Sequence, residues 1–116
     1  MKLEKDCIFC KIAAGEIPSD KVYEDEQVVA FKDLNPQAPV HVLVVPKAHF
    51  ATLAEMDAEG AELVKHALTV IPQIAASLGL ASGYRLIVNQ GQDAGQTVHH
   101  LHIHLLGGRP LGEKIV

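Results

Sequence analysis

Three histidines stand on alternate residues near the end of the chain, with apolar residues between and after them, in the segment His100–Leu106. In an extended strand successive side chains point to opposite faces, so this alternation predicts a strand over residues 98–106 whose three imidazoles share one face. Alternate residues of a strand lie roughly 6.6 Å apart, which suits imidazoles around a small anion such as phosphate. The opposite face belongs to the apolar residues Leu101, Ile103 and Leu105.

The alternation favours a functional site over a solvated surface, because three imidazoles at period two lie on an otherwise hydrophobic strand. Imidazoles are metal ligands as readily as they are catalysts. The pattern alone therefore leaves both kinds of site open.

Length and charge limit the class of protein. A chain of 116 residues is expected to form one domain, residues 1–116. The net charge of −4, without a basic cluster, argues against nucleic acid or an anionic membrane as a partner. No run reaches the ~20 apolar residues that span a bilayer. The charged first residues do not resemble a signal peptide, and two cysteines are too few for a disulfide scaffold, so a cytoplasmic location is expected.

The rest of the chain predicts strands and two helices. Strands are expected over residues 21–24 and 27–32, forming a hairpin, and over 40–45 and 84–89. A short helix is expected over 7–14. Together with the histidine strand, these elements indicate an α+β domain with a mainly antiparallel sheet.

A long helix is expected over residues 57–78, with Asp57 as its N-cap and Gly79 just past its end. Pro72 removes one helical hydrogen bond, so we expect a kink there or two shorter helices. His66, among polar neighbours, is expected to face solvent. The predicted buried face consists of Val64, Ala67, Leu68, Ile71, Ala75 and Leu78.

A glycine-bearing loop lies directly before the histidine strand and ends in Gly95, Gln96 and Thr97. Glycines let backbone N–H groups approach a ligand, and Thr97 adds a hydroxyl donor. A tight turn would need glycine equally. The position beside the imidazoles favours binding of an oxyanion.

A C-x-x-C pair, Cys7 and Cys10, lies near the N-terminus. Two cysteines at this spacing can bind zinc, cycle between dithiol and disulfide, or be two buried thiols. No predicted strand precedes Cys7, as a thioredoxin-type motif would favour. Zinc would need two further ligands, which the histidine-rich composition can supply without indicating which ones.

Taken together, these motifs resemble the histidine triad (HIT) family of nucleotide hydrolases and transferases. The ending Leu105–Pro110 looks most like the Hint branch, whose members hydrolyse purine nucleoside phosphoramidates. The resemblance covers nearly the whole chain. It also rests on Ile8-Phe9 with Lys11-Ile12, Glu16 to Pro18, Phe31 to Asp33, Asn35 to Pro39 before His41, Pro46-Lys47, Gly83 to Arg85, Asn89 and Gly95-Gln96.

The resemblance implies a mechanism. His102 would attack the α-phosphorus of a nucleotide and form a nucleotidyl-histidine intermediate that water cleaves, with its second nitrogen held by the His100 carbonyl. His104 would contact the phosphoryl oxygens and the leaving group, and His41 corresponds to a fourth histidine beside the site. The remaining implied contacts are Asn89, Gly95, Gln96 and Thr97 for phosphate or leaving group, Asp33 for the ribose, and Ile8, Phe9, Phe31 and Leu34 for the base.

Some members of the family carry a structural zinc, and the matching positions here are Cys7, Cys10, His49 and His100. The resemblance implies that such a zinc is not catalytic. If the His100 ring binds zinc, it cannot also do acid–base work.

The family fold implied is an antiparallel five-stranded sheet with one long and one short helix, extended across a homodimer. Two departures concern the dimer and the leaving group: Pro72 lies in the helix expected at the interface, and the tail lacks an aromatic residue that some Hint members carry. The leading hypothesis is a purine nucleoside phosphoramidase. The alternatives are a dinucleoside polyphosphate hydrolase of the same family, and a nucleotide-binding or interaction module with little turnover.

Overall fold

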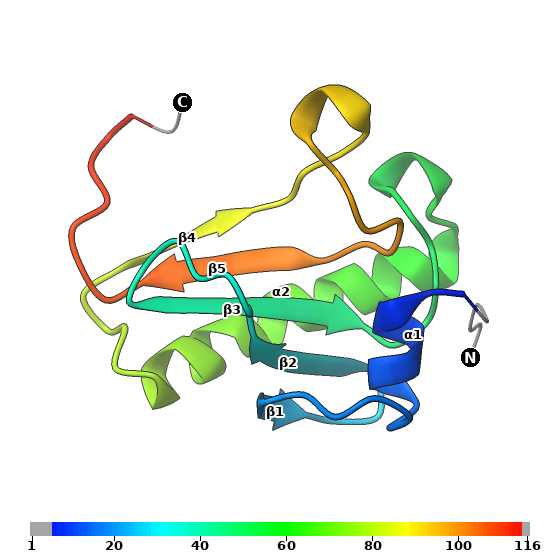
Figure 1. Ribbon diagram of the computed structural model, residues 1–116, viewed down its shortest axis with the longest axis horizontal. Helices are drawn as coiled ribbons and strands as arrows, with labels where there is room; N and C mark the ends of the chain where they lie inside the picture. The colour runs from blue at the N-terminus through cyan, green and yellow to red at the C-terminus, as the bar shows by residue number, and fades with distance from the viewer. Residues whose placement is uncertain (1–5, 115–116) are drawn as a thin grey trace.

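A computed structural model describes residues 6–114 as an antiparallel five-stranded sheet with a long helix across one face (Figure 1). The strand order is β1-β2-β3-β5-β4, and every neighbouring pair is antiparallel. Both the fold class and the five strands expected from the sequence are confirmed. The elements are α1 (Ile8–Ala13), β1 (Lys21–Glu24), β2 (Val28–Lys32), β3 (Val40–Pro46), α2 (Ala58–Ser77), β4 (Tyr84–Ile87) and β5 (Ile103–Gly107), with short 3₁₀ turns at Leu53–Glu55 and Gln92–Ala94.

The two faces of the sheet carry separate apolar cores. Helix α2 covers one face, and the short helix α1 packs against the other face at one end of β2 and β3 (Figure 1). Because side chains alternate along a strand, β2 and β3 supply both cores and read as continuous apolar runs. The core under α2 includes Val28, Ala30, Val42, Val44, Ile103 and Leu105, and the core under α1 includes Phe9, Ile12, Val29, Phe31, Leu43 and Val45.

Helix α2 begins and ends as its sequence predicts. The Asp57 side chain accepts from the Gly60 N–H at 2.8 Å, and Gly79 has a φ of +78° just past the last turn. The helix is not divided at Pro72, which lies inside it on the exposed side. Ile71 and Ile74, both buried in the core, pack the helix onto the sheet on either side of the missing hydrogen bond.

The buried face of α2 is rotated from the predicted one. Leu68 is 49% exposed, whereas Leu63, Val70 and Ile74 are buried. In the part of the chain that the structure describes, no helix is both long and apolar enough to cross a membrane.

The histidine strand is shorter than predicted, because β5 begins at Ile103 and residues 98–102 are not strand. Ile103 pairs with Val44, so the next pair two residues on would place Leu101 opposite Pro46. Proline has no N–H to donate to the ladder, and Leu101 N–H donates instead to the Phe50 carbonyl at 2.8 Å. Strand β4, which pairs with β5, consequently stops at Ile87 instead of reaching residue 89.

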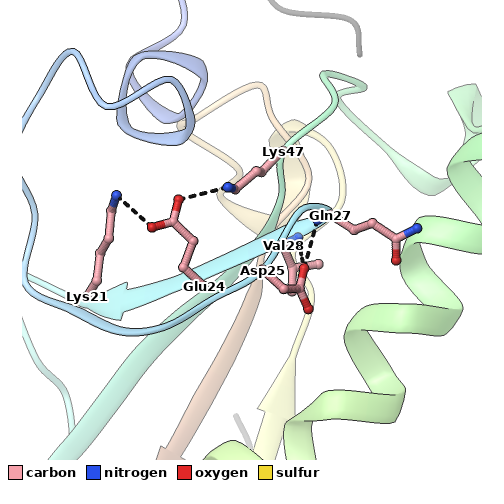
Figure 2. A network of polar contacts seen from close by, with 6 residues as sticks. All are labelled: Lys21, Glu24, Asp25, Gln27, Val28 and Lys47. Atoms are coloured by element: carbon pink, nitrogen blue, oxygen red, sulfur yellow. Dashed lines mark hydrogen bonds and ion pairs between the residues drawn. The ribbon is translucent and has the colours of Figure 1, made fainter.

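Asp25 ties the β1–β2 turn to helix α2. Its Oδ1 accepts from the backbone N–H groups of Gln27 and Val28 at 2.7 and 2.9 Å (Figure 2). Its Oδ2 accepts from Tyr23 Oη and from His66 Nε2, both at 2.7 Å. The His66 side chain is 32% exposed and its ring bonds the hairpin carboxylate, so the expectation that it faces solvent holds only in part.

We expect Asp25→Ala to lower the free energy of unfolding by about 2–3 kcal/mol at pH 7, because four donors lose a charged acceptor. Burial raises the pKa of Asp25, but the hydrogen bonds from His66, Tyr23 and the backbone outweigh burial and hold that pKa well below its usual range. A lowered carboxyl pKa stabilises the fold above about pH 4, and this stabilisation is lost as the pH falls below it. Urea unfolding at pH 7 and pH 3 should show the difference from wild type narrowing at the lower pH.

Glu24→Ala is the matched control on the same hairpin, because Glu24 forms its ion pairs among the described residues with Lys21 and the partly buried Lys47, both drawn beside it (Figure 2). Such a surface pair contributes about 0.5 kcal/mol or less. An Asp25→Ala effect as small as that of Glu24→Ala would contradict the stabilising role of the Asp25 network.

Candidate active site and metal centre

A pocket of about 350 Å³ opens on the α1 side of the sheet, bounded by α1, the end of β2 and the start of β5. Its wall is mostly apolar, and the two imidazoles of His102 and His104 lie in it with the carboxylate of Asp33. Of the residues singled out from the sequence, the pocket brings together Ile8, Phe9, Phe31, Asp33, Leu34, Thr97, His102 and His104.

Sequence reasoning missed half of the wall. One of the missed residues, Ile12, follows from the helical spacing of α1, since it lies four positions after Ile8 and three after Phe9. The others come from loops and from the sheet face, for which the chain offers no periodic signal. The missed lining residues are Ile12, Ile17, Pro18, Ser19, Asp20, Lys32, Leu43 and Val98.

Three expected contacts, Asn89, Gly95 and Gln96, lie outside this pocket. The Gln96 amide is instead used to hold its own loop: its Oε1 accepts from Gly91 N–H at 2.9 Å, and its Nε2 donates to the Ala51 carbonyl at 2.7 Å. Gln96 is 7% exposed. This loop shapes the approach to the pocket, and its exposed Thr97 is the residue that reaches the wall.

His102 is held in one tautomer by the backbone. Its Nδ1 lies 2.8 Å from the His100 carbonyl oxygen, which can only accept, so Nδ1 carries the proton. In the neutral ring the lone pair is then on Nε2. The Phe9 ring packs against the imidazole at nearly a right angle, with centroids 5.2 Å apart and an angle of 87° between the planes, and this contact restricts the orientation of the imidazole. The arrangement provides an unprotonated nitrogen on a rigid ring at the pocket wall.

His104 lies next to His102 on the same wall, with ring centroids 5.1 Å apart. Strand pairing sets His104 opposite Leu43 and His41 opposite Leu106, so His41 and His104 are diagonal neighbours on one face. His41 Nε2 lies 2.9 Å from His104 Nδ1 and 3.5 Å from Asp33 Oδ2.

Burial keeps both rings of this pair neutral. Burial, with smaller contributions from the neighbouring His102 and His41, lowers the pKa of His104 to about 4, although Asp33 opposes the shift. Burial also lowers the pKa of His41, although the Asp33 carboxylate opposes the shift.

The donor atoms of Asp33, His41 and His104 lie within 4.8 Å of one another, which is close enough to share a metal ion. The 2.9 Å between the two nitrogens is the length of an N–H···N hydrogen bond and is shorter than the roughly 3.3 Å between two nitrogens on one tetrahedral zinc.

A second cluster gathers Cys7, Cys10, His49 and His100, whose ligand atoms all lie within 4.8 Å of one another. His100 Nδ1 is 3.3 Å from Cys7 Sγ, 3.4 Å from Cys10 Sγ and 3.3 Å from His49 Nδ1. Two nitrogens on a tetrahedral zinc are roughly 3.3 Å apart, and a nitrogen and a sulfur roughly 3.5 Å. The four side chains therefore fit a Cys₂His₂ metal centre.

The backbone prepares His100 for this cluster. Its Nε2 donates to the Pro46 carbonyl at 2.7 Å, so in the neutral ring Nδ1 keeps the lone pair that faces the cysteines. Burial lowers the pKa of His100 to about 4, which favours that neutral form. Helix α1 positions both cysteines, with Cys7 as its N-cap and Cys10 one turn later.

His100 divides its work between the two sites. Its ring is fully buried in the cysteine cluster and does not line the pocket. The sequence-based expectation that the His100 side chain is catalytic is therefore corrected. Only its carbonyl serves the pocket, through His102. The prediction that all three imidazoles share one strand face is wrong for the same reason, because His100 lies in the bend before β5.

Comparison with known proteins agrees with this geometry. Residues 14–111 match the model of the HIT domain family. The chain is 47% identical over 114 residues to the purine nucleoside phosphoramidase of Escherichia coli strain K12, covering 97% of this chain and 96% of that protein. It is 54% identical over 109 residues to a HIT-like protein of Synechococcus elongatus, covering 94% and 96%.

Solved structures show the same fold. A histidine triad protein from Clostridium difficile superposes with a TM-score of 0.91 at 51% identity, covering 97% of this chain and 98% of that one. A HIT family hydrolase from Clostridium thermocellum gives 0.93 at 50% identity, covering 97% and 99%. The resemblance read from the sequence is thereby confirmed: this chain belongs to the HIT domain family.

Proposed function

We propose that this chain is a hydrolase that cleaves the P–N bond at the α-phosphate of purine nucleoside phosphoramidates through a nucleotidyl-His102 intermediate. The observation that carries the proposal is the His102 ring, which lines the pocket and whose Nδ1 is committed to the His100 carbonyl, so that the neutral ring keeps its lone pair on Nε2. The relative named purine nucleoside phosphoramidase supports the same class of substrate.

The pocket supplies a role for each group in this reaction. His102 Nε2 forms a bond to phosphorus as the P–N bond breaks, and the bonding electron pair leaves on the nitrogen, which takes a proton from solvent water and departs as the free amine. In the second step the oxygen of water bonds to phosphorus as the phosphorus–Nε2 bond breaks, the electron pair of that bond returns to Nε2, and a proton is released to solvent, which regenerates the neutral ring. His104 and the Thr97 hydroxyl contact phosphoryl oxygens, and Asp33 binds the ribose hydroxyls. The base packs between the apolar side chains Ile8, Phe9, Phe31 and Leu34.

Zinc in the cysteine–histidine cluster belongs to the proposal as a structural ion. The ion would be held by Cys7, Cys10, His49 and His100. It would cross-link the start of α1 to the segment after β3 and to the segment before β5.

A homodimer also belongs to the proposal. Strand β4 is an edge of the sheet, and Tyr84 and Leu86 on it are each 38% exposed. Leu68 on α2 is 49% exposed. An exposed apolar sheet edge favours pairing with a second copy. A molar mass in solution of one 12.5 kDa chain would contradict the dimer.

The substrate is tested by comparing kcat/KM for adenosine 5′-phosphoramidate with that for diadenosine tetraphosphate, on the same preparation. We expect the phosphoramidate to be the better substrate. A preference for diadenosine tetraphosphate would favour the alternative, a dinucleoside polyphosphate hydrolase. Binding of AMP with hydrolysis of neither compound would show a nucleotide-binding module instead.

A further inference from the structure

Both ring nitrogens of His41 are occupied, and one of the partners is a backbone group. The N–H of Gln37 points at His41 Nδ1 at 3.0 Å. A backbone N–H can only donate, so this nitrogen must present its lone pair. Gln37 lies in the loop between β2 and β3, and its side chain turns the other way, donating from Nε2 to the Asn35 carbonyl at 3.0 Å.

The remaining nitrogen of His41 then carries the proton in the neutral ring. His41 Nε2 is 2.9 Å from His104 Nδ1, so His41 is the donor and His104 the acceptor. With its Nδ1 accepting, neutral His104 must hold its own proton on Nε2. One backbone N–H thus determines the tautomer of two successive imidazoles.

The same donor disfavours a cationic His41. A second proton on His41 would have to sit on Nδ1, where it would face the N–H of Gln37. Asp33 Oδ2 at 3.5 Å is the charged group near this ring that favours the cation. The Asp33 carboxylate raises the pKa of His41, but burial lowers it by more, so the pKa of His41 stays below its ordinary value.

We propose that Gln37 is a positioning residue whose backbone N–H, acting through His41, holds His104 neutral with its proton on Nε2. His104 then works as an uncharged hydrogen-bond donor to a phosphoryl oxygen, and not as a cationic acid. His102 has the opposite tautomer, with its proton on Nδ1. Two histidines two residues apart are thereby made nucleophile and donor by two different backbone groups.

The tautomers are read directly from wild-type protein labelled with ¹⁵N in histidine, by two-bond ¹⁵N–¹H correlation at pH 7. We expect neutral rings with the proton on Nε2 for His41 and His104, and on Nδ1 for His102. A protonated Nδ1 in His41 or in His104, or a cationic His104 at this pH, would overturn the proposal. This measurement needs no turnover, so it is independent of whether the proposed function holds.

Gln37→Pro removes the backbone donor, and the preceding residue is already a proline. The matched variant Gln37→Ala keeps the N–H and loses only the side chain, and it should show the wild-type tautomers. In Gln37→Pro, His41 should lose its single tautomer, and kcat/KM should be about tenfold below that of Gln37→Ala, the effect of one weakened hydrogen bond.

The catalytic part of this inference rests on the proposed function. Equal kcat/KM and equal tautomers in a folded Gln37→Pro variant would overturn the role of the backbone N–H. If Gln37→Pro does not fold, the wild-type spectrum still decides the assignment of both rings.

Discussion

Replacing His102 with alanine is expected to lower kcat/KM for adenosine 5′-phosphoramidate by at least about 10⁴-fold, because the reaction loses the atom that bonds to phosphorus. No other unprotonated ring nitrogen at the pocket wall can take its place, since the lone pair of His104 is engaged by His41. The thermal midpoint should change little in comparison, because His102 makes one hydrogen bond, to the His100 carbonyl.

Two further variants make this result specific. His99→Ala removes an exposed imidazole from the same segment and should keep wild-type activity. His41→Ala should weaken turnover by about 10²-fold without abolishing it, because His41 acts through His104. Turnover of the His102→Ala variant within tenfold of wild type would end the nucleophile assignment.

The intermediate itself can be trapped. In a His104→Ala variant the hydrogen-bond donor beside His102 is missing. Both formation and breakdown of the nucleotidyl adduct should therefore be slower than in wild type, and slow breakdown leaves time to detect the adduct. Intact-mass and peptide mass spectrometry after brief exposure to substrate should place the nucleotidyl group on the peptide that holds His102. An adduct on another residue would contradict the mechanism.

Zinc is expected to bind at one ion per chain and to raise the thermal midpoint by about 10 °C or more over the chelated protein. A ligand present at 1,000 times its dissociation constant stabilises the native state by about 4 kcal/mol. For a domain of this size each kcal/mol corresponds to roughly 3–5 °C. The structural reason is that the ion would join the N-terminal helix α1 to segments about 40 and 90 residues away in the chain.

The control for the metal is again His99→Ala, a histidine outside the cluster. Cys10→Ala should abolish stoichiometric zinc and its stabilising effect, and His99→Ala should preserve both. Less than about 0.1 zinc per chain after growth with added zinc, or an equal effect of chelator on wild type and Cys10→Ala, would remove the metal from the proposal.

The alternating pattern of residues 101–105 predicted the core correctly, because Leu101, Ile103 and Leu105 are all nearly inaccessible to solvent. The caps of α2 were equally predictable, since Asp57 and Gly79 act within one turn of the helix end. What was missed on α2 was the rotation of its buried face. Leu68 is as apolar as Leu63, and only the position of the sheet decides which of them is covered.

The site shows the same division at closer range. Residue types and spacing were enough to identify the family that the comparisons confirm, and to single out His102, which lies in the pocket wall, and Cys7 and Cys10, which lie in a cluster that could hold a metal ion. They did not show that His100 turns its ring away from the other two, because the cause lies at Pro46, more than fifty residues earlier, which cannot extend the ladder opposite Leu101.

The sequence by itself determined which residues are apolar, which carry imidazole or thiol groups, and where helices can begin and end, since these depend on neighbours within a turn or a strand. Only the tertiary structure indicates which ring nitrogen carries the proton in His41, His100, His102 and His104. A ring's tautomer depends on whether the backbone group it faces is a carbonyl or an N–H. That group lies two residues away for His102 and four for His41, but 54 for His100, and the path of the folded chain decides which group faces the ring. The sequence therefore specified the chemical groups of this protein, and the folded backbone specified the hydrogen-bond partner of each group.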